Sequence, residues 1–221
     1  MTRGTYLDRR WPNPRLFQEV AVDWCKDQSR LLLTLVWQGY DRLKNELTPV
    51  QFSARDEAKE ETLNYLLAGK IEDAMDGFEP FRFSYQPPET AKRKRGRGKS
   101  PTPDHGFVLR ENPRSIWSVE GKVLLHDRDV NAYVSEVRNN FLSGRYATFS
   151  REGAMLGYLL KGSPIAALDN VAARLKAELG PHPFFRDRPH RISIHARKLS
   201  SHRKRSEVFS CHHLILAIAG S

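Results

Sequence analysis

Charged side chains interrupt two apolar stretches near the middle of the sequence. Asp104 stands just before the short apolar run 107–109, and Glu120 and Lys122 lie inside a second run, 116–125. A charge inside a strand-like run is costly to bury unless it is paired, hydrated or bound to a metal. Two carboxylates and a lysine that a hairpin brings together have the chemistry for metal-assisted phosphodiester cleavage, since carboxylates hold Mg²⁺ and the ion activates water.

Each residue of this group has an expected role. Asp104 and Glu120 are the expected metal ligands, and the backbone carbonyl of Gly121 is near enough in sequence to add a neutral one. Lys122 lies two residues after Glu120, so on a strand both side chains point to the same face. Its ammonium group can orient the attacking water or offset charge that develops on the phosphate. Mg²⁺ is the expected ion, with Mn²⁺ as a substitute.

Hydrophobic periodicity and turn residues predict the elements that must position this group. The pattern predicts helices over 14–47 and 53–74, a strand over 80–85, a hairpin over 106–126 and a helix over 129–141. It then predicts a helix over 150–160 with Ser150 as N-cap, a helix over 165–179 that Gly180-Pro181 ends, and strands over 190–196 and 208–219. Helices and strands alternate without an internal repeat, so the expected class is mixed α/β.

Pro103-Asp104 followed by Glu120-Gly121-Lys122 with apolar flanks resembles the PD-(D/E)xK nuclease superfamily, which has the restriction-endonuclease-like fold. That family's core runs helix, strand, hairpin with the acid and the E-x-K, then helix, and the elements predicted over residues 53–160 follow this order. The resemblance implies a mixed sheet flanked by helices. Residues 1–50 are then an N-terminal helical extension, and residues 51–221 a nuclease domain that ends in a C-terminal β-hairpin.

The resemblance also implies a further acidic residue. Many members carry a glutamate on the first core helix that points at the metal. Glu60 is the candidate because it shares a helix face with Leu63 and Leu67, and Glu57 and Glu61 are close alternatives.

The formal net charge of +10 favours a polyanionic partner, and nucleic acid fits the chemistry above. The basic residues are unevenly distributed: one cluster lies in the stretch 86–103 and a second in 186–205. The first stretch is rich in Pro and Gly, which predicts a mobile loop. The loop is either a solubilising linker or an arm that grips phosphates. The candidate nucleic-acid-binding residues are Lys92, Arg93, Lys94, Arg95, Arg97, Lys99, Arg145 and Arg197.

The cysteines and histidines give weaker signals. The two cysteines, Cys25 and Cys211, are far apart, which argues against a disulfide framework and fits the cytoplasm. No apolar run reaches the roughly 18 residues that a membrane span needs. Cys211 and His212, beside other histidines, suggest a zinc site. However, consecutive residues of a strand point to opposite faces, so these two cannot easily bind the same ion. We interpret the histidines of the tail as packed strand residues, or as phosphate contacts at His195 and His213.

The leading hypothesis is a Mg²⁺-dependent DNA endonuclease, the effector of an anti-phage or restriction-type system, with a partner protein that supplies target recognition or activation. The apolar helix over 14–47 is a reasonable element for docking such a partner or for homo-oligomerisation. One alternative is a non-catalytic nucleic-acid-binding subunit of a defence or CRISPR-like complex. Another is a metal-independent RNA-processing enzyme that uses His195 or His213 as general acid or base.

Overall fold

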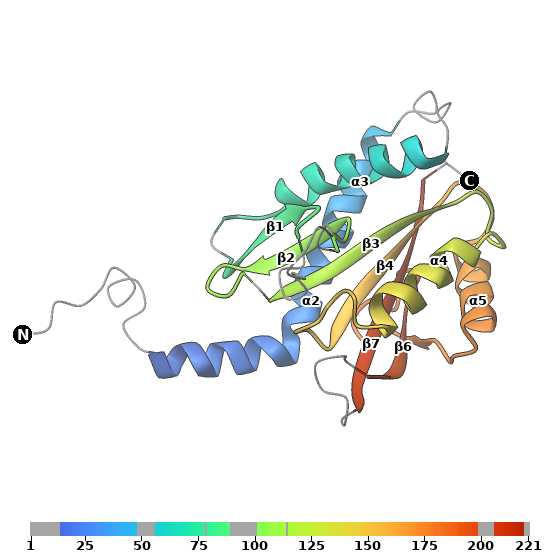
Figure 1. Cartoon of the computed structure of the whole chain (residues 1–221). Coiled ribbons are helices and arrows are strands. Elements are labelled where there is room, and N and C mark those ends of the chain that lie inside the picture. Colours follow the sequence, from blue (N-terminus) through green and yellow to red (C-terminus); the bar gives the residue numbers. More distant parts are fainter. Residues whose placement is uncertain are drawn as a thin grey trace, which may run out of the picture.

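A computed structural model of the chain describes residues 14–47, 56–77, 79–88, 101–113, 115–198 and 206–218. Seven strands form one mixed sheet in the order β1-β2-β3-β4-β7-β6-β5, and helices cover both of its faces (Figure 1). This arrangement confirms the predicted α/β class.

The first half of the sheet is a meander that carries the acidic hairpin. Helices α2 (Pro14–Glu46) and α3 (Asp56–Glu72) precede β1 (Phe81–Tyr85), β2 (His105–Leu109) and β3 (Ile116–Leu124). β1 pairs with β2, and β2 with β3, in antiparallel fashion. The observed elements agree with those predicted for residues 14–126.

The second half of the chain crosses over and completes the sheet. The chain passes from β3 through α4 (Asn131–Glu136) and a π-helix, η3 (Val137–Leu142), to β4 (Glu152–Leu159), which pairs in parallel with β3. Helix α5 (Pro164–Leu175) and the short β5 (Gly180–Pro181) lead to the hairpin of β6 (His190–Lys198) and β7 (Ser206–Ala217). β7 pairs in parallel with β4, so it lies inside the sheet.

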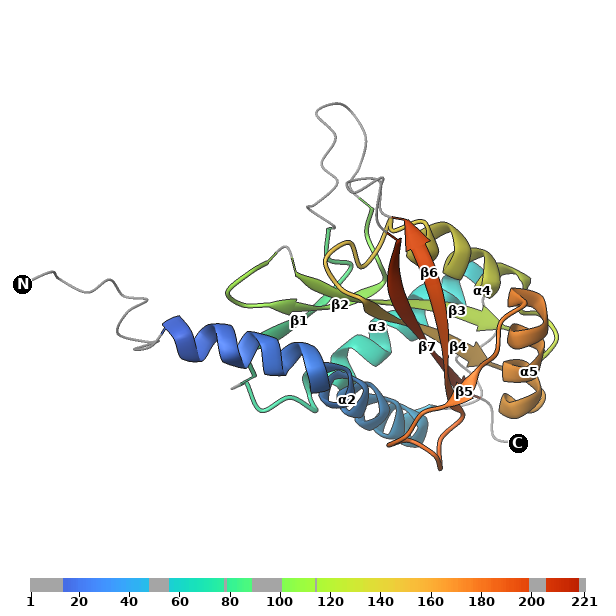
Figure 2. The ribbon, with the colours of Figure 1, turned by 90° about the horizontal axis from the view of Figure 1, so that it is seen from below.

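Each face of the sheet has its own apolar core. On one face α2 and α3 pack against the strands through buried side chains such as Val36, Leu67 and Trp117. On the other face α4, η3 and α5 do so through residues such as Phe141 and Val171. Figure 2 shows α2 crossing beneath the strands while its N-terminal half extends beyond the sheet. The C-terminal half of α2, within the predicted extension 1–50, therefore belongs to the core.

One predicted element is wrong. Residues 150–160 form the central strand β4 and not a helix. β4 is buried on both faces between β3 and β7, so its sequence is a continuous apolar run without the alternation of a half-exposed strand. Gly153 and Gly157 suit this position, because a Cβ at either would lie within 2.7 Å of a neighbouring side chain.

Two helix ends also differ from the prediction. The helix expected over 129–141 runs as α4 for six residues and then widens into η3. α5 ends at Lys176, whose backbone is left-handed, and the expected terminator Gly180-Pro181 instead forms β5. Among the residues that the structure describes, no helix is long and apolar enough to cross a membrane.

Candidate catalytic site

The β2–β3 hairpin brings Asp104 and Glu120 together. Asp104 directly precedes β2, and His105 is paired with Val119, so the register places Asp104 opposite Glu120. Two hydrogen bonds join the strands here: the Asp104 N–H donates to Glu120 Oε2 (3.2 Å), and the N–H of Gly121, the residue after Glu120, donates to Asp104 Oδ2 (2.9 Å). The predicted metal-binding pair is therefore in contact.

The two carboxyl groups are difficult to ionise together. Burial, and then the charge of Asp104, raise the pKa of Glu120 to about 9. Burial also raises the pKa of Asp104, against the hydrogen bond from Gly121 and the charge of Lys122. A divalent cation bound between such oxygens would favour the ionised forms, so this pair has the chemistry of a Mg²⁺ site.

Lys122 is paired with Glu60 across the interface between β3 and α3. Its Nζ lies 2.5 Å from Glu60 Oε1, and the second oxygen of Glu60 accepts the Val123 N–H at 3.3 Å. Burial works to lower the pKa of Lys122, but the hydrogen bond and charge of Glu60 outweigh it, so the pKa is raised and the ammonium form is stabilised. Glu60 thus reaches the predicted site, but both of its oxygens are engaged by β3.

The neighbouring acidic candidates on α3 differ from Glu60 in position. Glu61 is exposed to solvent, and the side chain of Glu57 lies outside the described residues. Of the three candidates, the contact with Lys122 is made by Glu60.

Sequence reasoning missed residues from the helical segment after the hairpin. The charge of Glu136, on α4, contributes to the raised pKa of both Glu120 and Lys122. Asn140, in η3, donates a short hydrogen bond to Glu136. Asn140 lies in the π-helix that follows α4, and π-helical turns are frequent at functional sites.

Asn64, on α3, is a further residue that sequence reasoning missed, and it contacts the hairpin and β4. Its Oδ1 accepts the Tyr158 hydroxyl at 2.7 Å and lies 3.2 Å from His105 Nε2. Gly121 packs so closely on this group that a Cβ there would lie 2.8 Å from the Tyr158 ring. Asn64 stands four residues after Glu60, so the helical period was the one signal that could have placed it beside the site.

The predicted nucleic-acid-binding residues fall into three groups. Lys92, Arg93, Lys94, Arg95, Arg97 and Lys99 lie outside the described residues. Arg145 is exposed, in the turn that precedes Tyr146.

Arg197 has no exposed side chain. Its guanidinium group donates to the carbonyls of Phe141, Ala147 and Ser150 and is paired with Glu207 at 2.5 Å. The guanidinium group cannot reach a phosphate without breaking these bonds, so we remove Arg197 from the nucleic-acid-binding set.

The histidines proposed for a metal-independent mechanism are joined by Ser193. Its hydroxyl lies 2.7 Å from both His213 Nε2 and His195 Nε2. His213 is fully buried, and its Nδ1 lies 3.1 Å from the Tyr133 hydroxyl. His213 therefore has no access to a substrate, while His195 remains half-buried.

Comparisons with protein-family models, with curated proteins and with solved structures each found no significant match. The chemistry of the site must therefore be inferred from its own geometry.

Proposed function

We propose that this protein is a Mg²⁺-dependent DNA endonuclease of the PD-(D/E)xK type. The observation that carries the proposal is the buried contact between Asp104 and Glu120, with the Lys122 ammonium group two residues along the same strand. Two acids and a lysine from one hairpin are the set that the sequence motif predicts. The element order α3-β1-β2-β3-α4, with β4 parallel to β3, supports the restriction-endonuclease-like fold.

The metal would supply a Lewis acid and an activated water at the scissile phosphate. Asp104 and Glu120 would bind the ion, each through the oxygen that its backbone partner leaves free. Glu60 keeps Lys122 protonated and fixes the position of its Nζ, so the ammonium group can contact a phosphate oxygen or the attacking water. The carboxylate of Glu136, held by a hydrogen bond from Asn140, lies close enough to Glu120 to raise its pKa and can orient water molecules there.

DNA is the proposed substrate because the chain is basic and one of its two basic stretches, 86–103, leads directly into Asp104. Lysines and arginines in such a segment bind the sugar-phosphate backbone with little dependence on sequence. We therefore propose that target choice comes from a partner protein, as in an anti-phage or restriction-type system, and that Mn²⁺ can replace Mg²⁺.

The test is cleavage of plasmid DNA and of RNA with Mg²⁺, Mn²⁺ or EDTA. We expect DNA cutting with either metal and none in EDTA. Glu120→Gln and Lys122→Met should each lower the rate by a factor of about 100 or more, as for removal of a group that stabilises the transition state. The exposed residues Glu178 and Lys161 provide the matched controls Glu178→Gln and Lys161→Met, which should cut at the wild-type rate.

Two results would point to the alternatives. DNA binding without cutting under every condition, unchanged by both site variants, would favour a non-catalytic nucleic-acid-binding subunit. RNA cutting that persists in EDTA and is lost in His195→Gln would favour the histidine mechanism. DNA cutting that ignores both Glu120→Gln and Lys122→Met would refute the assignment of the site.

A further inference from the structure

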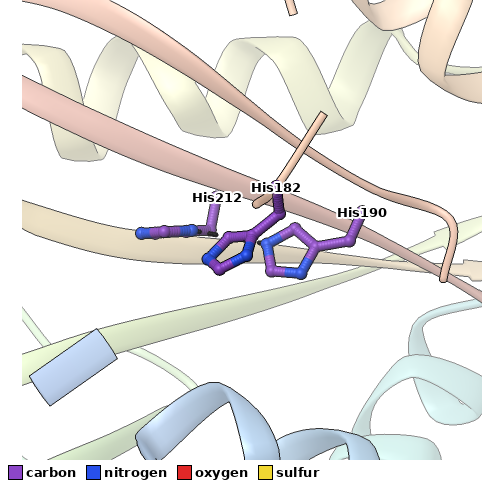
Figure 3. A group of neighbouring side chains, drawn as sticks. All are labelled: His182, His190 and His212. Atoms are coloured by element: carbon purple, nitrogen blue, oxygen red, sulfur yellow. Dashed lines mark hydrogen bonds between the residues drawn. The ribbon is translucent and has the colours of Figure 1, made fainter. Parts of the chain in front are cut away.

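Three histidines from separate segments converge on the face of the sheet that α2 covers. His182 follows β5, His190 opens β6 and His212 lies in β7, and all three are buried (Figure 3). One ring nitrogen from each lies within 4.8 Å of the other two. Cys211 points to the opposite face, as the strand alternation predicted, so the group consists of histidines alone.

The spacing of the ring nitrogens fits a tetrahedral metal ion. His190 Nε2 and His212 Nδ1 are 3.3 Å apart, and the ring centroids of His182 and His190 are 4.5 Å apart. Two nitrogen ligands of Zn²⁺, at bond lengths of about 2.0–2.1 Å and tetrahedral angles, are separated by about 3.3–3.4 Å. The His190–His212 pair already has this separation, and the ligand nitrogens of the three rings all lie within 4.8 Å of one another, so a pair that is wider than about 3.4 Å must close when one ion binds.

A carboxylate behind His212 provides the second observation. His212 Nε2 is buried without a hydrogen-bond partner among the described residues, and the nearest carboxylate oxygen, Glu152 Oε2, is 3.8 Å away. A histidine that binds metal through one nitrogen usually donates its other N–H to a carboxylate, which fixes the ring and increases its basicity. Binding through His212 Nδ1 would leave Nε2–H pointing at Glu152.

The surroundings of the group suit a cation. All three rings are buried, and a carboxylate oxygen of Glu152 stands 3.8 Å from His212 Nε2. Neutral imidazole is the form that binds metal.

We propose that His182, His190 and His212 bind one Zn²⁺, with Glu152 as the carboxylate partner of His212 and water as the fourth ligand. The ion ties the segment between β5 and β6 to β7 and shares no residue with the carboxylate site. Three hydrogen bonds must open when it binds: the one between His190 Nε2 and His212 Nδ1 (3.3 Å), Trp37 Nε1–H to His190 Nδ1 (3.4 Å) and Phe184 N–H to His182 Nδ1 (3.2 Å). Trp37 therefore reports metal binding through its fluorescence.

The experiment is titration of the EDTA-stripped full chain with Zn²⁺ alone, by calorimetry and tryptophan fluorescence, with Co²⁺ absorption as a test of tetrahedral geometry. We expect one ion per chain in the wild type and also in Glu120→Gln, which removes the carboxylate site. His190→Gln and His212→Gln should weaken binding by more than about 100-fold, and Glu152→Gln by about 10–100-fold. His195→Gln, on the opposite face, should bind as the wild type does.

A wild-type chain that takes up no Zn²⁺ would overturn the proposal, as would a Glu120→Gln chain that loses its one ion. An unchanged Zn²⁺ affinity in Glu152→Gln would show that Glu152 is not the carboxylate partner of His212. Circular dichroism of each variant checks its fold. If the buried histidine variants do not fold, Zn²⁺ uptake by the wild type and by Glu120→Gln decides the proposal, and Glu152→Gln decides the carboxylate partner, because Glu152 is only partly buried and its replacement keeps the side-chain shape.

Discussion

Replacing Glu120 by glutamine should change how the stability of the metal-free protein depends on pH. The pKa of Glu120 is raised to about 9 in the folded state, whereas an unfolded glutamate titrates near 4.5. Between these values the folded protein holds a proton that the unfolded chain has released. Stability that Glu120 contributes is therefore full below pH 4.5 and falls as the pH rises toward 9.

The size of the effect follows from the width of that window. One group that is protonated in the folded state and ionised in the unfolded state lowers the free energy of unfolding by about 1.4 kcal/mol per pH unit. From pH 6 to pH 8 the wild type should lose about 3 kcal/mol relative to Glu120→Gln, whose amide does not titrate. Glu120 is only 6% exposed, so solvent screens this effect little.

The assay is urea unfolding in EDTA at pH 6, 7 and 8, with Glu178→Gln as the matched control. We expect the stability curves of wild type and Glu178→Gln to fall together and that of Glu120→Gln to separate upward from them. Mg²⁺ at about 100 times its dissociation constant should then restore about 2.7 kcal/mol to the wild type and nothing to Glu120→Gln. Parallel curves for all three proteins in EDTA would refute the inference that Glu120 is held protonated beside Asp104.

Three further substitutions test the surroundings of the site by urea unfolding at pH 7. Gly121→Ala places a Cβ 2.8 Å from the Tyr158 ring and should lower the free energy of unfolding by about 1–3 kcal/mol. An unchanged free energy of unfolding would mean that the hairpin can move away from Tyr158. Glu60→Gln removes the charged partner of Lys122, so it should lower the free energy of unfolding by about 1.5–3 kcal/mol and also lower the rate of DNA cutting. A wild-type rate of cutting would mean that Lys122 takes no part in catalysis. Arg197→Met should lower the free energy of unfolding by about 3–5 kcal/mol but leave the affinity for DNA unchanged. Weaker DNA binding by a folded variant would mean that Arg197 contacts DNA after all.

The local pattern of the sequence was sufficient to predict the acidic hairpin. Asp104, Glu120 and Lys122 interrupt apolar runs whose ends are marked by turn residues, so both the strands and the contact between the acids could be inferred. β4 was predicted as a helix because a strand that is buried on both faces lacks the alternation of apolar and polar residues that distinguishes a strand from a helix.

The residues that contact the site from distant parts of the sequence could not be predicted, for a different reason. Glu136, Asn64 and the buried Arg197 have ordinary surroundings in the sequence, and their roles arise from elements that come together only in the folded sheet. Arg197 shows this most clearly: its position in a basic stretch indicated a surface contact, whereas Glu207 and four backbone carbonyls surround its guanidinium group.

The position of β7 in the sheet has a consequence for synthesis. β7 is the strand that inserts between β4 and β6, yet residues 206–217 are translated after every other strand that the structure describes. At about 5–20 residues per second, the acidic hairpin leaves the ribosome several seconds before the strand that completes the sheet beside β4. Until then β4 has an unpaired edge, so the nascent chain cannot assemble the full support of the site. The proposed nuclease would therefore acquire its activity only after β7 has been made.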